Sequence, residues 1–186
     1  MPYPADPVNS VYDAFVEASE RYADRPFLHI PATATASYAQ GPIELGYAEA
    51  AAEVEACRAH YRSKGYRTPM RVGLLLENRA EYFIHWLALN SLGCSVIPLH
   101  PDMPTAEMGY FLDFGEAALV VTLPEAMDRL HNACAELNPA PPVVACDRLD
   151  ALPQAPEQDD DAVIDRSTEC ALLYTSGSTG KPKGCI

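Results

Sequence analysis

Apolar residues in this chain follow two kinds of spacing, which alternate along most of its length. Spacings of three and four residues predict helices over 11–22, 47–64, 79–92, 105–114 and 124–137. Short apolar runs predict strands over 27–30, 43–45, 72–76, 94–99, 118–121, 142–146 and 170–174. Runs that do not alternate with polar residues are typical of strands covered on both faces. The repeated order of strand and helix predicts an α/β fold, a doubly wound and mainly parallel sheet flanked by helices.

Local signals support the ends of several of these elements. Polar residues suited to helix N-termini and glycines suited to helix C-termini fall at the expected boundaries. They are Ser10 with Asp13 in a capping box, Thr105 as a cap, Gly65 and Gly93. Residues 31–42 are rich in alanine, threonine, proline and glycine, so we expect a loop or a hairpin arm there.

The chain divides into four stretches by pattern. Residues 1–46 form an N-terminal helix and an extended arm, and residues 47–146 carry the repeated βα units. Residues 147–166 contain seven carboxylates and almost no periodicity, and residues 167–186 hold a last strand and a glycine-rich loop. The run 159–161 consists of three aspartates, and such runs are more often solvated surface loops than metal sites.

Composition limits the classes of partner. Acidic residues outnumber basic ones 26 to 13, and the formal net charge of −13 opposes binding to nucleic acid or to an anionic membrane. The sequence shows neither a secretory signal nor a membrane span, so we expect a cytoplasmic protein. The six cysteines lie far apart without a C-x-x-C pair, and the five histidines are scattered, so we expect neither a disulfide framework nor a metal site.

Residues 174–184, Tyr-Thr-Ser-Gly-Ser-Thr-Gly-Lys-Pro-Lys-Gly, carry the strongest chemical signal. They follow the apolar run 171–173, which we interpret as a buried strand. Glycines let backbone N–H groups turn inward around an anion, hydroxyls add donors, and lysines add positive charge. These groups are Gly177, Gly180 and Gly184, the hydroxyls of Thr175, Ser176, Ser178 and Thr179, and Lys181 and Lys183. The combination predicts a phosphate cradle just past the end of a strand, where open α/β sheets bind ligands.

Two other interpretations fit this stretch less well. The phosphate loop G-x-x-x-x-G-K-[ST] would need a glycine at Thr175 and a hydroxyl at Pro182, so two of its four fixed positions fail. A flexible Gly/Ser linker would not be expected to follow an apolar strand directly or to contain Lys-Pro-Lys.

The stretch resembles the phosphate-binding signature of the adenylate-forming (AMP-binding) superfamily, which includes acyl-CoA synthetases, peptide-synthetase adenylation domains and luciferases. Weaker similarities precede it in the family's order, at 46–49, 71–78, 92–101 and 119–122. Gly46 stands where family members often have Ser or Thr, and 67–70 replaces a usual Gly-Asp turn. The chain is most like the N-terminal portion of an acyl-CoA synthetase, and we expect it to be a partial N-terminal domain.

The resemblance implies a role for each residue of the cradle. The backbone from Gly177 to Gly180 would bind the β- and γ-phosphates of ATP, together with the hydroxyls of Thr175, Ser176, Ser178 and Thr179. Lys183 occupies the family's fixed lysine position and would be the catalytic charge, whereas Lys181 occupies a variable one. The implied cofactors are ATP and Mg²⁺, with coenzyme A as co-substrate and no protein metal site.

The resemblance also implies the activity of the parent protein. It would activate a carboxylic acid to an acyl-adenylate and transfer the acyl group to coenzyme A. The alternatives are an adenylation domain that loads a carrier protein, and a truncated fragment without catalysis. The residues that recognise adenine, ribose and the acid would lie outside these 186 residues. We therefore expect the chain alone to be inactive, and its uncovered sheet edge to favour self-association.

Overall fold

The structure is a computed structural model that describes residues 9–157, 163–175 and 183–185. Its helices are α1 (Val11–Arg21), α2 (Ala32–Thr35), α3 (Tyr47–Ser63), α4 (Ala80–Asn90), α5 (Thr105–Phe114) and α6 (Met127–Cys134), with 3-10 turns η1 (Pro124–Ala126) and η2 (Leu149–Ala151). Its strands are β1 (Pro26–Ile30), β2 (Ile43–Gly46), β3 (Arg71–Leu75), β4 (Ser95–Pro98), β5 (Ala117–Thr122), β6 (Val143–Ala145), β7 (Leu173–Thr175) and β8 (Lys183–Cys185).

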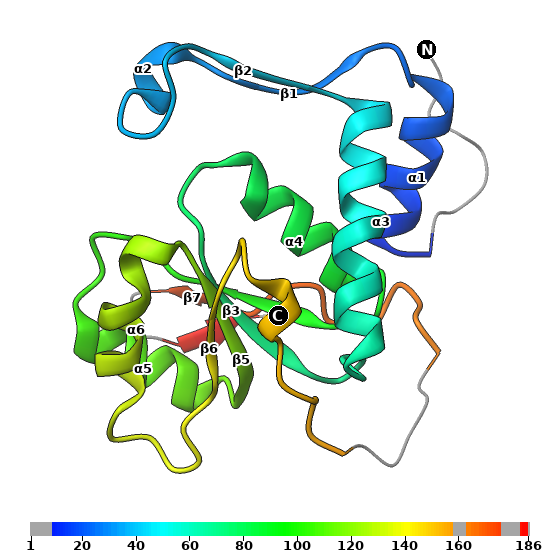
Figure 1. The fold of residues 1–186 in the computed structure, drawn as a ribbon. Coiled ribbons are helices and arrows are strands. Elements are labelled where there is room, and N and C mark those ends of the chain that lie inside the picture. Colours follow the sequence, from blue (N-terminus) through cyan, green and yellow to red (C-terminus); the bar gives the residue numbers. More distant parts are fainter. Residues whose placement is uncertain (1–8, 158–162, 176–182, 186) are drawn as a thin grey trace.

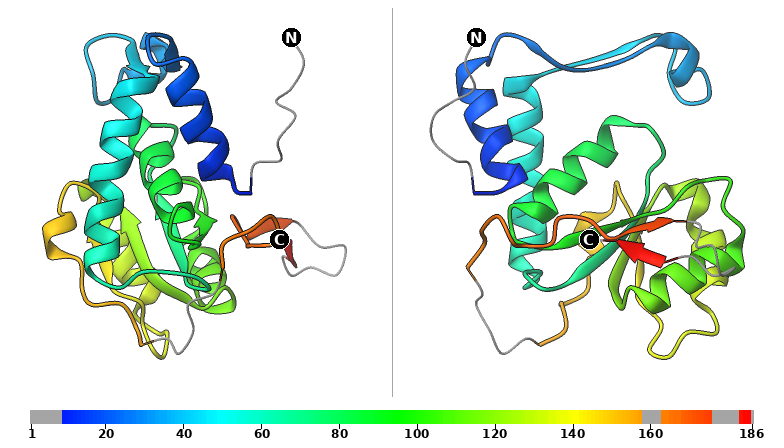
Figure 2. Two further views of the ribbon diagram at one scale, coloured as in Figure 1. Left: turned by 90° about the vertical axis from the view of Figure 1, so that its right-hand side faces the viewer. Right: turned by 180° about the vertical axis from the view of Figure 1, so that it is seen from behind.

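The central sheet has the strand order β4-β3-β5-β6, and all its pairs are parallel. The chain moves from β3 to β4 on one side, then crosses back to β5 and β6 on the other. This reversal of direction places helices on both faces of the sheet (Figures 1 and 2). The predicted fold class, a doubly wound and mainly parallel α/β sheet flanked by helices, is confirmed.

The two faces of the sheet bury separate apolar clusters. On one face Val72 and Leu74 pack with residues of α3 and α4, including Ala50, Val54 and Leu87. On the other face Leu75, Ile97 and Val120 pack with residues of α5 and α6. Side chains of a strand point alternately to its two faces, so an apolar run such as β3 supplies both clusters. Gly73 leaves room for α5, since a Cβ there would lie 2.5 Å from Cδ2 of Leu112.

An N-terminal arm stands apart from the sheet. Strands β1 and β2 pair antiparallel and extend away from α1 and α3, with α2 near their far end (Figure 1). Helix α1 begins as predicted, because the Ser10 hydroxyl accepts a hydrogen bond of 3.0 Å from the backbone N–H of Asp13. Arg79 stacks over the ring of Tyr38 at 4.2 Å and so links the arm to the turn before α4. Residues 31–42, expected as a loop or a hairpin arm, connect β1 to β2 and contain the helical turn α2.

One predicted helix cap and one predicted helix boundary are wrong. Thr105 does not cap α5, because the cap position is Pro104 and Thr105 is already the first helical residue. The helix expected over 124–137 begins as a 3-10 turn at Pro124–Ala126 and is α-helical only over Met127–Cys134. Proline fixes φ and lacks an N–H, so it suits the first position of a helical turn. The length of the α-helix that follows depends on its packing.

The six cysteines are free thiols, three of them buried. Burial raises the pKa of Cys57 and of Cys94 to about 12 each, so these thiols stay protonated near neutral pH.

Within the described ranges, no helix is long and apolar enough to cross a bilayer. The predicted acidic loop at 147–166 is irregular apart from η2 where the structure describes it, and its three aspartates at 159–161 lie outside the described residues.

His85 of α4 lies in the core with only 3% of its surface exposed. Its Nδ1 lies 2.7 Å from the Tyr61 hydroxyl and 3.7 Å from Sγ of Cys57, and in the neutral ring this nitrogen can accept the O–H of Tyr61. This arrangement suits the neutral imidazole, because a buried positive charge would lose its hydration. Burial accordingly lowers the pKa of His85 to about 4.

The first prediction concerns Gly109, where α5 approaches α6. A Cβ at Gly109 would lie 2.5 Å from the carbonyl oxygen of Ala133, which is backbone and cannot rotate away. Gly109→Ala should lower the free energy of unfolding by about 1–3 kcal/mol, although alanine favours helices by about 1 kcal/mol. Urea titration measures the effect. The control is Gly41→Ala, where nothing lies within 4 Å; equal stabilities of the two variants would contradict the close approach.

The second prediction is a pH dependence of stability. A pKa of 6.5 in the unfolded chain and about 4 in the folded chain means that the unfolded state binds the extra proton between these values. Stability from His85 is therefore complete above pH 6.5 and is lost as pH falls toward 4, by about 3 kcal/mol at most. The free energy of unfolding, measured by denaturant titration across this range, should depend less steeply on pH in His85→Gln than in the wild type. Identical pH slopes would show that His85 is not held neutral.

Candidate functional site

The glycine-rich stretch joins two short strands that pair with each other. Strands β7 and β8 form a two-stranded antiparallel sheet of their own, in which Thr175 lies opposite Lys183 and Tyr174 lies opposite Gly184. The predicted cradle therefore belongs to a β-hairpin. It does not follow a strand of the central sheet, which corrects the expected location.

The segment before β7 touches the central sheet only briefly. Ala171 forms a single parallel bridge with Val96 of β4, supported by bonds from Val96 N to Cys170 O at 3.3 Å and from Leu172 N to Val96 O at 2.9 Å. The predicted buried strand over 171–173 is thus only partly right. Leu172 is buried, but Leu173 is 53% exposed because it already belongs to the hairpin.

The hairpin has one packed face and one open face. Tyr174 and Gly184 face α5, where a Cβ on Gly184 would lie 3.0 Å from Cδ1 of Leu172 and 3.5 Å from Cε1 of Phe114. The residues on the other face, which alternate with these two, are exposed. They are Leu173, Thr175, Lys183 and Cys185.

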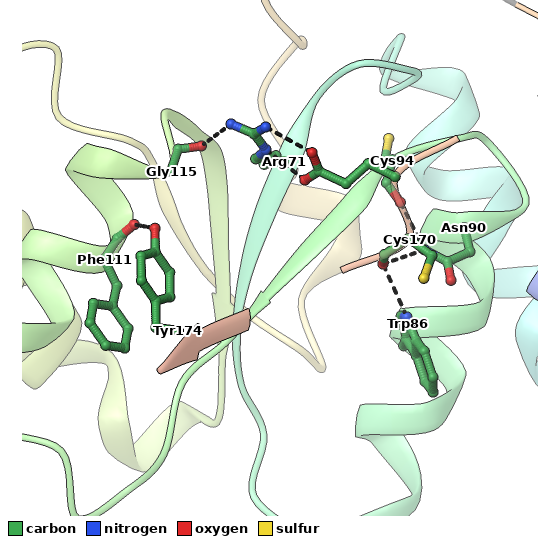
Figure 3. Close-up of polar contacts among 9 residues, drawn as sticks. Arg71, Trp86, Asn90, Cys94, Phe111, Gly115, Cys170 and Tyr174 are labelled. Carbon is green, nitrogen blue, oxygen red and sulfur yellow. Dashed lines mark hydrogen bonds and ion pairs between the residues drawn. The ribbon is translucent and has the colours of Figure 1, made fainter. Parts of the chain in front are cut away.

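Tyr174 attaches the hairpin to the C-terminal end of α5 (Figure 3). Its ring stacks on Phe111, with centroids 3.8 Å apart and planes 13° from parallel. Its hydroxyl donates to the carbonyl oxygen of Phe111 at 2.8 Å. Burial raises the pKa of Tyr174 to about 12, so the hydroxyl keeps its proton at neutral pH and remains a donor. The first residue of the motif is therefore an anchor.

A second attachment holds the backbone at Cys170. Its carbonyl oxygen accepts hydrogen bonds from the Trp86 indole at 3.3 Å and from the Asn90 amide at 3.0 Å. The Asn90 amide also donates to the carbonyl oxygen of Cys94 at 2.9 Å (Figure 3). Both side chains come from α4, so the helix on the opposite face from α5 also fixes the segment that leads into the hairpin.

A third attachment is an ion pair. The Arg71 guanidinium donates through Nε and Nη2 to both carboxylate oxygens of Glu169, at 2.7 and 2.8 Å. Its Nη1 donates to the carbonyl oxygen of Gly115 at 3.3 Å. Hydrogen bonding to Arg71 lowers the pKa of Glu169, and the same pairing raises the pKa of Arg71, so both groups are charged at neutral pH.

The structure brings together two of the predicted site residues. Thr175 and Lys183 are cross-strand partners, and both side chains lie on the open face of the hairpin. A hydroxyl donor beside an ammonium group is a donor set that suits an anionic oxygen ligand such as a phosphate. The remaining predicted residues lie outside the described residues. They are Ser176, Gly177, Ser178, Thr179 and Gly180, together with Lys181.

No three His, Cys, Asp or Glu side chains gather into a possible metal site within the described ranges. Mg²⁺ often binds through substrate phosphates with only one or two carboxylates, so a protein cage is not needed for an ion that accompanies a nucleotide. The described residues therefore fit the phosphate part of such a ligand and supply no metal site of their own.

Sequence reasoning missed the residues that hold the hairpin. Arg71 and Glu169 are opposite charges that stand just before two apolar runs, and parallel strands begin at the same edge of a sheet. That pattern could have suggested an ion pair, but only with the strand order known. The packing of Tyr174 on Phe111 has no local signal, because 63 residues separate the two.

Comparison with known proteins gives a consistent result. The sequence profile of the family described as AMP-binding enzyme matches residues 15–186. Tyrocidine synthase 2 of Brevibacillus parabrevis is 34% identical over 125 residues, which are 67% of this chain and 3% of that protein. The mitochondrial malonate–CoA ligase ACSF3 of Bos taurus is 29% identical over 140 residues, which are 71% of this chain and 23% of the ligase.

A solved structure from a study of fatty acyl-adenylate ligases from E. coli and L. pneumophila has the same fold. The TM-score is 0.77 at 23% sequence identity, over all of this chain and 33% of that one. The chain thus spans a third or less of each of these three proteins.

The third prediction tests the attachment at α5. A Cβ on Gly115 would lie 2.5 Å from Cδ1 of Ile97, 2.9 Å from the carbonyl oxygen of Phe111 and 3.0 Å from the Tyr174 hydroxyl. Gly115→Ala should therefore displace Tyr174 and speed hydrogen exchange of the hairpin amides. Tyr174→Phe removes only the hydroxyl, so it should speed this exchange less, through a loss of about 1 kcal/mol in the local stability of the hairpin. Hairpin exchange that is unchanged in Gly115→Ala would contradict this attachment.

Proposed function

We propose that this chain, which belongs to the family of AMP-binding enzymes, forms the N-terminal portion of an enzyme that activates a carboxylic acid with ATP. The products are an acyl-adenylate and pyrophosphate. The observation that carries the proposal is the motif at 174–184, in which Thr175 and Lys183 share the open face of an anchored hairpin. A hydroxyl and an ammonium group on one exposed face can both meet the oxygens of a triphosphate.

The chemistry explains why such groups are needed. A carboxylate oxygen attacks the α-phosphorus of ATP, a new oxygen–phosphorus bond forms, and the bond to the bridging oxygen of pyrophosphate breaks. Negative charge therefore grows on the departing pyrophosphate. Donors that are already in place at that position lower the energy of the transition state without reorganising. In this proposal, Lys183 supplies the positive charge and Thr175 a hydrogen bond, and Mg²⁺ bound to the phosphates would neutralise further charge.

For the second half-reaction, we propose that the thiol of coenzyme A accepts the acyl group. The similarity to malonate–CoA ligase supports this choice of acceptor. A second candidate is the thiol of a carrier protein, which the similarity to tyrocidine synthase 2 favours. Both acceptors attack the same acyl-adenylate with sulfur and release AMP. The first half-reaction is therefore common to the two candidates.

The acceptor can be identified directly. The full-length protein that carries this chain is given ATP and a radiolabelled acid, and then either coenzyme A or a carrier protein with its phosphopantetheine arm. Label that appears in acyl-CoA supports the first candidate, and label that becomes attached to the carrier supports the second. Pyrophosphate release without a carboxylic acid would contradict acid activation itself.

The fourth prediction tests the role of Lys183. Loss of one donor to a developing negative charge costs on the order of 10²–10³-fold in rate. Lys183→Ala in the full-length protein should slow ATP–pyrophosphate exchange by roughly that factor in the presence of the accepted acid. Exchange of labelled pyrophosphate into ATP measures this step alone.

The matched control for that experiment is Lys64→Ala. Lys64 is the C-cap residue of α3, which packs on the face of the sheet opposite α5, the helix that holds the hairpin. This variant should exchange pyrophosphate as the wild type does. Equal rates for the wild type and Lys183→Ala would remove Lys183 from the reaction.

A further inference from the structure

Arg71 joins three parts of the chain that are distant in sequence. It stands at the start of β3, pairs with Glu169 from 98 residues away, and reaches the end of α5 through Gly115. A guanidinium group offers five donors in a planar fork, so one side chain can hold a carboxylate with two bonds and a carbonyl with a third. About a quarter of the Arg71 side chain and a fifth of the Glu169 side chain are exposed, so water screens the pair only in part.

The contacts of Arg71 support both ends of the segment 169–174, which leads to the hairpin. Glu169 stands at the beginning of that segment, and Tyr174 stands at its end. The Phe111 carbonyl oxygen accepts both the Tyr174 hydroxyl at 2.8 Å and the backbone N–H of Gly115 at 2.9 Å. Arg71 in turn holds the carbonyl of Gly115. One side chain therefore fixes Glu169 directly. It also supports the helix end on which Tyr174 is seated, through its bond to Gly115 (Figure 3).

We propose that Arg71 is a positioning residue for the phosphate contacts of Thr175 and Lys183, acting through Glu169 and the C-terminal end of α5. This inference rests on the function proposed above. Thr175 follows Tyr174 directly, and Lys183 is its cross-strand partner, so a shift of the segment moves both. Misplacement of a reacting or binding group by about 1 Å can cost on the order of 10²-fold in rate.

A purely stabilising ion pair would behave differently. Its loss would lower the free energy of unfolding, and the protein that remains folded would keep the kinetic constants of the wild type. A positioning role predicts instead a change in the parameters that depend on phosphate contacts. The KM for ATP should rise and kcat should fall, while the KM for the carboxylic acid stays the same, because the acid does not meet the hairpin in this proposal.

The fifth prediction is therefore made for Arg71→Met in the full-length protein. ATP–pyrophosphate exchange should show a KM for ATP raised by roughly 10-fold or more, with the KM for the acid within about twofold of the wild type. Hydrogen exchange at Thr175 and at Lys183–Cys185 should become faster.

Three variants control for simple loss of stability. Arg71→Met with Glu169→Gln removes the unpaired carboxylate and should recover stability without recovering the KM for ATP. Arg71→Lys keeps the charge but not the fork, so it should recover the kinetics only in part. Arg58→Met breaks a more exposed ion pair, with Glu55 within α3, and should leave both KM values unchanged.

The outcomes separate this inference from the proposed function. A wild-type protein that exchanges pyrophosphate, with an Arg71→Met variant that keeps the wild-type KM for ATP, would overturn the positioning role alone. So would unchanged hydrogen exchange of the hairpin, which needs no activity to measure. A wild-type protein with no exchange for any acid would overturn the proposed function, and with it the role of Arg71 in catalysis.

Discussion

The attachment of the β7–β8 hairpin to the C-terminal end of α5 is the contact on which the candidate site depends. A two-stranded hairpin is at most marginally stable alone, so its position must come from what it packs against. Here the ring of Tyr174 stacks on Phe111, and the Tyr174 hydroxyl donates a hydrogen bond to the carbonyl oxygen of Phe111. Helix ends leave carbonyl groups without partners inside the helix, and Arg71 uses one of them, that of the cap residue Gly115. Tyr174 shares the Phe111 carbonyl with the backbone N–H of Gly115.

The central sheet makes this attachment possible. Its strands are buried on both faces, so α5 is held firmly by the apolar cluster beneath it, in which Met108 and Leu112 are almost fully buried. The helix thus offers a rigid support, and the hairpin gains its geometry from the core without belonging to the sheet. The opposite helix, α4, adds Trp86 and Asn90 to the same segment. Phosphate contacts on such a support would be placed before the ligand arrives, which is what charge stabilisation in a transition state requires.

Most of the fold could be predicted from the sequence because its signals are local. The face of α3 formed by Ala50, Val54, Cys57 and Tyr61 is buried as its spacing predicts, and β3 has the unbroken apolar run of a strand covered on both sides. The failures concern non-local pairing. Nothing in the run 171–173 distinguishes a sheet strand from half of a hairpin, since the exposure of Leu173 depends on which strand it meets. Thr175 and Lys183 could be chosen from the motif, whereas Arg71 and Glu169 become visible only once the strands are in order.

The overall charge of −13 would repel a nucleotide, so attraction must come from groups at the site itself, such as Lys183 on the hairpin. The most direct test is a crystal structure of the full-length protein with a non-hydrolysable ATP analogue. We expect the triphosphate on the open face of the hairpin, with its oxygens about 3 Å from Oγ1 of Thr175 and Nζ of Lys183. A triphosphate bound elsewhere, with neither side chain in contact, would contradict the central claim.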